Sequence, residues 1–169
     1  MRKFLTLLLL FTLNACQSES QDSFLNLELK SPYGEIIKTR LVYTPDKMQQ
    51  GLSGIKPDQF GEDEGMLFFY LEEQEMHFWM PDTYFDLDLI YLDKNLKITE
   101  IIRKLPHYIG RANPSMIPRA RGVWSRHVLE MKATSVLSQK LKIGDSLIWI
   151  SPIEMRDAEE RIKNELKKN

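Results

Sequence analysis

A single cysteine, Cys16, occurs in this chain of 169 residues, and an intrachain disulfide is therefore excluded. The sequence has no internal repeat, no low-complexity stretch and, after its leader, no apolar run long enough to cross a bilayer. Its histidines, His77, His107 and His127, lack the spacing of metal ligands, and its serines lack a nucleophile-elbow context. These absences predict one ordinary domain with neither a metal nor a cofactor, and without a strong signature of catalysis.

The first sixteen residues have the pattern of a secretory leader that ends in a cysteine. Two basic residues precede an almost unbroken apolar run over residues 4–13, which is too short for a permanent transmembrane helix. Leu13-Asn14-Ala15-Cys16 resembles a bacterial lipobox. The resemblance implies that residues 1–15 are a signal peptide and that Cys16 carries lipid; the alternative is a plain signal peptide followed by a free thiol.

Lipidation would place the protein outside the cytoplasm, with the membrane as its first partner. Gln17 is not the aspartate associated with inner-membrane retention, so we expect the periplasmic face of the outer membrane in a Gram-negative cell. Residues 16–23 form the lipidated cysteine and a polar tether, whose seven residues after Cys16 reach about 23 Å when extended. Removal of residues 1–15 leaves 21 basic and 24 acidic residues, a net charge of −3. This balance gives no reason to propose nucleic-acid binding.

Residues 24–153 have the pattern of short strands separated by turns. Ser31-Pro32-Tyr33-Gly34 suits a type I turn, and Thr44-Pro45 suits the start of a short helix that ends at Gly51. We predict an α+β domain, mainly β, with a compact curled or barrel-like sheet and a second short helix over 135–141. The predicted strands cover residues 24–30, 35–43, 66–71, 85–92, 96–102, 124–131 and 146–150.

The end of the chain has a different pattern. Ser151-Pro152-Ile153-Glu154 fits a capping box with proline at the first helical position, and apolar residues then recur at helical spacing. This predicts a C-terminal helix over 154–169 that packs on the sheet. A projecting helix that binds a partner or the membrane is the alternative.

Charge is segregated along the domain. Residues 57–93 contain eleven acidic residues and no lysine or arginine, whereas residues 101–129 contain six lysines and arginines and no acid. The simpler interpretation is that the two blocks lie together and neutralise each other. The functional alternative is that the loop 105–122 binds an anionic envelope component through Arg111, Arg119 and Arg121, whose planar guanidinium groups suit carboxylate or phosphate.

Several short motifs occur in an order that resembles the bacterial and archaeal domain-of-unknown-function family 192. The resemblance implies a compact, mainly β domain of α+β type and brings no established activity. The motifs are Gly51-Leu52, Gly65 to Phe68, Phe78-Trp79-Met80 with Thr83, Leu87-Asp88, Val128-Leu129-Glu130 and Gly144-Asp145.

These motifs contain the candidate site residues. Asp86 and Asp88 lie two apart on a predicted strand, where their side chains would share one face and form an acid–base pair. With Glu130 they are weak candidates for catalysis. Trp79, Thr83 and Asp88 are candidates for ligand binding. The structural alternatives are that Asp88 accepts hydrogen bonds that fix a turn and that Trp79 belongs to the core.

Three functional hypotheses remain open from the sequence. The first is a non-catalytic envelope lipoprotein whose domain binds a ligand or an envelope protein. The second is an envelope hydrolase or lyase that uses its acidic residues on an anionic substrate held by Arg119 or Arg121. The third is an assembly module that docks through the C-terminal helix.

Overall fold

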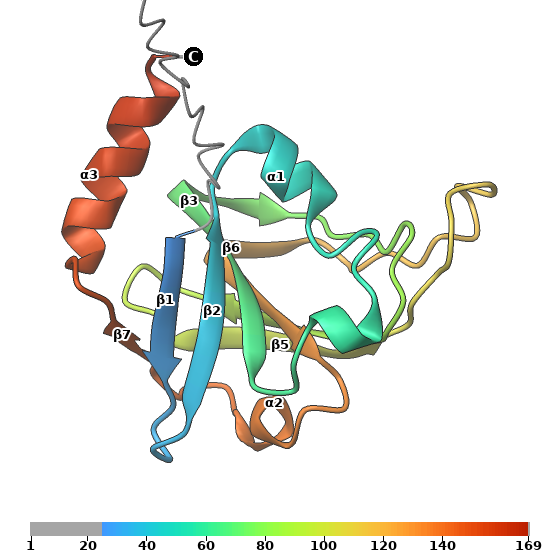
Figure 1. Cartoon of the computed structure of the whole chain (residues 1–169), viewed down its shortest axis with the longest axis horizontal. Helices are drawn as coiled ribbons and strands as arrows, with labels where there is room; N and C mark the ends of the chain where they lie inside the picture. Colours follow the sequence, from blue (N-terminus) through green and yellow to red (C-terminus); the bar gives the residue numbers. More distant parts are fainter. Residues whose placement is uncertain (1–24, 169) are drawn as a thin grey trace, which may run out of the picture.

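The computed structural model describes residues 25–168, so the predicted signal peptide, Cys16 and the tether lie outside the described residues. The described chain forms one mixed sheet of seven strands in the order β5-β4-β6-β3-β2-β1-β7 (Figure 1). The strands are β1 (Leu25–Lys30), β2 (Ile36–Val42), β3 (Glu64–Met76), β4 (Leu87–Leu92), β5 (Ile98–Leu105), β6 (Val123–Lys132) and β7 (Ile148–Ile150). The helices are α1 (Pro45–Gln50), the 3-10 turn η1 (Pro57–Gln59), α2 (Val136–Lys140) and α3 (Met155–Leu166).

The sheet curls strongly but does not close. In Figure 1, β1 and β2 stand upright while β5 and part of β6 cross behind them. An isolated antiparallel bridge between Lys97 and Ser146 joins the segments next to the two ends of the sheet. The prediction of a mainly β domain with a curled sheet is confirmed, and its edges remain β5 and β7.

Both faces of the central strands are buried. All six residues of β4 are buried. Successive side chains alternate between the two faces of the sheet, and both faces are covered. Leu87, Leu89 and Tyr91 join one apolar cluster, and Ile90 and Leu92 join the other. Each fully buried side chain of this kind contributes about 1.5–3 kcal/mol.

One pair of neighbouring strands is parallel, and its connection builds part of the site. β2 pairs with β3 in parallel, whereas the other strand pairs are antiparallel. Parallel strands need a crossover connection, and here it contains α1. As predicted, α1 begins at Pro45, and it ends at Gly51, whose φ of +49° favours glycine.

The C-terminal helix packs on the domain, but its predicted capping box is wrong. α3 begins at Met155, after Glu154, with no side-chain cap. The Trp149 indole Nε1 donates to the carbonyl of Ile153 at 2.9 Å, which holds the preceding residues outside the helix. Ile162 is 1% exposed within the apolar cluster, so the helix covers the sheet. No helix within residues 25–168 is long and apolar enough to span a membrane.

Candidate functional site

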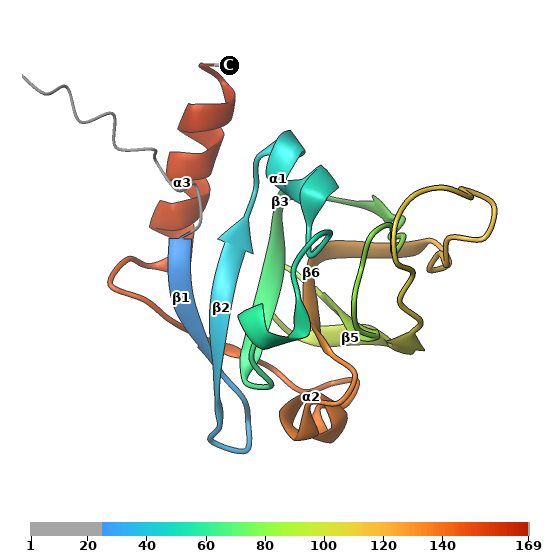
Figure 2. The same cartoon turned by 45° about the vertical axis from the view of Figure 1, so that its right-hand side comes forward.

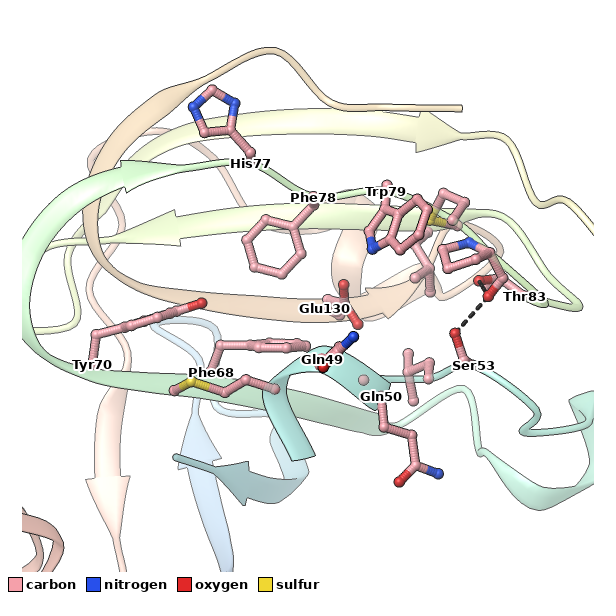
Figure 3. Close-up of a pocket in the computed structure, with 16 residues that line it drawn as sticks. Gln49, Gln50, Ser53, Phe68, Tyr70, His77, Phe78, Trp79, Thr83 and Glu130 are labelled. Carbon is pink, nitrogen blue, oxygen red and sulfur yellow. Dashed lines mark hydrogen bonds between the residues drawn. The ribbon is translucent and has the colours of Figure 1, made fainter. Parts of the chain in front are cut away.

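A pocket of about 260 Å³ lies between α1 and the segment that follows β3 (Figure 3). The sheet supplies its floor and part of its walls, and α1 with the irregular segment after β3 supplies the rest. The lining residues are Met48 to Ser53, Phe68, Tyr70, His77 to Pro81, Thr83, Leu87 and Glu130.

Strand register explains why an acid lies at the floor of this pocket. Glu130 pairs with Met66 on β3 and with Leu89 on β4, so it lies in the middle of three strands. Phe68 and Tyr70 lie two and four residues after Met66, on the same face of β3. The side chain of Glu130 therefore points into an aromatic environment.

The Glu130 carboxyl group is buried without a partner. The residue is 5% exposed, and its Oε2 atom forms no hydrogen bond with any residue in the described part of the chain. Burial disfavours the charged form and raises the pKa of Glu130 to about 8. The Tyr91 hydroxyl group is also buried and unpartnered among residues 25–168, and its pKa is raised by burial and by Glu130. At neutral pH, Glu130 is thus mainly a neutral acid, and a positive or hydrogen-bonding neighbour would favour its ionised form.

Aromatic rings form the walls around this carboxyl group. Phe68 and Phe78 meet edge to face with their centroids 4.9 Å apart. Trp79 is 38% exposed, and its indole nitrogen is directed into the pocket (Figure 3). The Arg119 guanidinium group lies 5.0 Å from the centroid of the Trp79 ring and supports it by a cation–π contact.

The backbone on both sides of Trp79 is fixed to the loop 105–122. Met80 N–H donates to the carbonyl of Pro118 at 3.1 Å, and Ala120 N–H donates to the carbonyl of Phe78 at 2.9 Å. These two hydrogen bonds flank the bridge between Trp79 and Arg119. The aromatic wall is therefore positioned by the loop behind it.

Polar side chains close the remaining side of the pocket. The hydroxyl groups of Ser53 and Thr83 both donate to the carbonyl of Pro81, which ties the turn after α1 to the segment after β3. Gln49, an exposed residue of α1, also lines the pocket (Figure 3). Amide and indole groups of this kind can donate hydrogen bonds to a bound molecule.

The structure brings three of the predicted site residues together. Trp79, Thr83 and Glu130 line this pocket, although Thr83 itself is 3% exposed and serves mainly to tie the loops. Asp88 lies on the opposite face of the sheet from Glu130, because it pairs with Met131 rather than with Glu130.

Asp88 has a set of structural partners. Its carboxylate accepts hydrogen bonds from Arg103 Nη1 at 2.6 Å, from the Ser138 hydroxyl group at 2.7 Å and from the Lys104 backbone N–H at 2.9 Å. The residue is 1% exposed. Its oxygens therefore hold β5 and α2 against β4. Asp88 accepts structural hydrogen bonds, as the structural alternative expected, but these join two strands and a helix rather than fix a turn.

Asp86 does not form the predicted acid–base pair with Asp88. β4 begins at Leu87, so Asp86 lies outside the strand and turns toward His107. It accepts hydrogen bonds from the backbone N–H of His107 at 2.9 Å and contacts its Nδ1 atom at 2.6 Å. The His107 hydrogen bond lowers the pKa of Asp86, whereas an acid–base pair would raise one of its two pKa values.

The three loop arginines do not form one cluster. Arg121 pairs with Glu100 at 2.8 Å, Arg119 stacks on Trp79, and Arg111 is exposed. Part of the loop 105–122, drawn in yellow in Figure 2, projects from the domain. Contacts between Arg103 and Asp88, and between His107 and Asp86, join the basic block to the acidic block. These contacts agree with partial neutralisation within the fold.

A larger groove of about 530 Å³ lies along β1 and β2 on another part of the domain. Two of its basic residues already have acidic partners: Lys38 pairs with Asp63 at 2.7 Å, and Arg40 pairs with Glu64 at 2.6 Å. Among the described residues, no group of three or more His, Cys, Asp or Glu side chains could hold a metal ion. The unpartnered Glu130 therefore makes the smaller pocket the stronger candidate.

The fold and the pocket define a mainly β domain with a preformed, aromatic-walled cavity. The family model for domain of unknown function 192, described as "Uncharacterized ACR", matches residues 28–149, and the chain belongs to this family. This confirms the resemblance found in the sequence motifs. The comparison with curated proteins gives no match.

Two solved structures share this fold. A Sinorhizobium meliloti protein described as a "putative transcription regulator" is 27% identical over 73% of this chain and 92% of its own, with a TM-score of 0.57. A protein of unknown function from Novosphingobium aromaticivorans is 21% identical over 75% of this chain and 85% of its own, with a TM-score of 0.58. The second likeness concerns the fold alone.

Proposed function

We propose that this protein is a lipid-anchored envelope protein whose domain binds a small organic ligand in the pocket above Glu130. One observation carries the proposal: a carboxyl oxygen is buried without a hydrogen-bond partner from residues 25–168, at the floor of a preformed cavity. Buried polar atoms in proteins are nearly always paired, and an unpaired one costs about 1–3 kcal/mol. A bound molecule would supply the missing partner.

The form of the pocket supports binding of a small molecule. Its volume of about 260 Å³ is just below the range of about 300–1,000 Å³ for drug-sized ligands. Aromatic walls with a few directed polar groups are typical of such sites. The backbone contacts of the Trp79 segment keep the cavity open in the absence of a ligand.

The other hypotheses have less support. Among the described residues that line the pocket, Glu130 is the one carboxylic acid, so the paired acidic groups of a typical hydrolase are not assembled there. Ala158 and Ile162 of α3 are buried against the domain, which covers the middle of the apolar stripe of this helix and leaves Leu166, 36% exposed, at its end. Binding therefore fits the geometry better than hydrolysis or helix docking.

A thermal-shift screen tests the binding proposal. The full chain, purified in a non-ionic detergent, is screened against amines, sugars, organic acids and peptidoglycan fragments, since a ligand of the native state raises the melting temperature. We expect one chemical class to raise it in the wild type and not in Glu130→Gln. Glu73→Gln, which alters an exposed glutamate of β3, is the matched control. Shifts that are equal in all three proteins would refute a site at Glu130.

The membrane anchor is tested separately. Cells that express the full chain are labelled with radioactive palmitate, and we expect label in the wild type and none in Cys16→Ala. Fractionation should place the wild type with membranes. Equal labelling of both proteins would remove the lipoprotein part of the proposal and leave the pocket unaffected.

A further inference from the structure

We infer that the ligand of this pocket is an organic cation whose ammonium head lies against the Glu130 carboxylate and between the aromatic walls. The inference rests on the proposed function, because it names the chemical class of the same ligand. Three properties of the pocket support it: the charge of its lining residues, its aromatic walls and its volume.

The charge of the pocket has one sign. Of the described residues that line it, Glu130 is the one acid, and none is lysine or arginine. A buried carboxylate is costly unless a cation or several donors accompany it. Without a lysine or arginine in the lining, and with His77 at the rim 3.4 Å from the carboxylate of Glu75, an ammonium group is the partner that completes an ion pair at Oε2.

The walls favour the same class of ligand. Phe68, Tyr70, Phe78 and Trp79 surround the approach to Glu130 (Figure 3). The faces of aromatic rings attract cations, and groups of such rings are a general means of recognising quaternary ammonium ions. An anionic ligand would meet the acid at the floor of the pocket with no lysine or arginine to pair with. A volume of about 260 Å³ suits the head group of such a cation rather than a large molecule.

Binding of a cation must expel a proton from the site. The pKa of Glu130 is about 8 when the pocket is empty, so at pH 7 the bound cation would displace about 0.9 proton per site. While the pH is below the pKa of Glu130, the affinity for a permanently charged cation should therefore increase about tenfold for each unit by which the pH is raised.

The other titratable groups at the pocket do not account for the expected release of a proton. Tyr70 on β3 and Tyr91 on β4 face Glu130, and burial raises the pKa of both. α1 contributes neutral side chains, including Gln49, and the segment after β3 contributes His77 at the rim. Glu73→Gln, which alters an exposed glutamate of β3 outside the pocket lining, is the control for proton release.

Titration calorimetry with choline tests the inference on the full chain in a non-ionic detergent. The comparison compound is 3,3-dimethylbutan-1-ol, which has the same shape without the charge. We expect choline to bind with release of about 0.9 proton at pH 7, measured in buffers of different ionisation enthalpy. We expect Glu130→Gln to lose at least about thirtyfold in affinity, and Glu73→Gln to retain both affinity and proton release.

The outcomes separate this inference from the proposed function. Equal binding of choline and its neutral analogue, or choline binding that survives in Glu130→Gln, would overturn the cationic class. If choline, ethanolamine and their neutral analogues all fail while another compound in the screen binds in a Glu130-dependent way, the inference is wrong and the proposed function stands. If no compound gives a Glu130-dependent shift, both are refuted.

The ammonium group could come from a free metabolite or from a lipid head group. Retention of the Cys16→Ala chain on phosphatidylethanolamine vesicles, but not on phosphatidylglycerol vesicles, would assign the lipid if the further change Glu130→Gln abolishes it. Binding of free choline or ethanolamine without such retention would assign the metabolite. Both results support an organic cation.

Discussion

Replacing Glu130 with glutamine should stabilise the empty protein, and the gain should grow with pH. The pKa of this side chain is about 8 in the folded state against an ordinary value of 4.5. Between the two pKa values, the acid keeps its proton in the folded protein and has lost it in the unfolded chain. The wild type therefore loses stability as pH rises from 4.5 to 8. Glutamine has nearly the same shape and no charge to bury.

The size of the effect follows from the shift in pKa. The interval from 4.5 to 8 is 3.5 pH units, and at 1.36 kcal/mol per unit the full penalty is about 5 kcal/mol. Most of this interval lies between pH 5 and pH 9. The difference in unfolding free energy between Glu130→Gln and the wild type should therefore increase by about 4 kcal/mol over that range.

Urea unfolding of both proteins at unit steps from pH 5 to pH 9 measures this difference. The comparison cancels the titration of all other groups, including His127, because they are present in both proteins. Curves that remain parallel to within about 1 kcal/mol would show that Glu130 ionises as it does in the unfolded chain. That result would refute the reasoning about its burial.

Three further substitutions test the framework around the pocket. Asp88→Asn should lower the unfolding free energy by about 2 kcal/mol, because it weakens the charged hydrogen bond to Arg103; a change below about 0.5 kcal/mol in urea unfolding would contradict this role. The pKa of buried His127 is lowered to about 3, so the wild type loses stability as pH falls below 6.5. His127→Phe should therefore gain about 2 kcal/mol at pH 5 relative to pH 8, and thermal melts with no such difference would contradict it. Gly51→Ala should cost about 1–2 kcal/mol and weaken ligand binding, since its φ is +49° and a Cβ would lie 3.2 Å from Phe68; unchanged melting and affinity would show that this turn adapts.

Most elements could be predicted from the sequence because their signals are local. The turn at residues 31–34, the start of α1 at Pro45 and the strand around 87–92 depend on nearby residues. β3 is longer than predicted, because its end at residues 74–76, Gln-Glu-Met, pairs with β6 after a register shift. This pairing, like the order of the strands, depends on contacts between distant segments and leaves no hydropathy signal.

The candidate site was only partly predictable for the same reason. Glu130 had a visible signal, since it is an acid in the apolar sequence Val128-Leu129-Glu130-Met131. The alternation of β3 places Phe68 and Tyr70 on one face, but only the pairing with β6 shows that Glu130 shares it. Gln49 reaches the pocket through the crossover between parallel strands, which no local pattern reveals.

The attachment of the Trp79 segment to the loop behind it makes the pocket and the loop one energetic unit. Asp82 N–H donates to the carbonyl of Gly110, and Thr83 N–H donates to the carbonyl of Tyr108, in addition to the bonds on either side of Trp79. A molecule that orders the aromatic wall would therefore slow amide hydrogen exchange of residues that it never touches. Conversely, a partner that bound this loop would change the occupancy of the pocket. The basic loop would then regulate the ligand-binding site rather than form it.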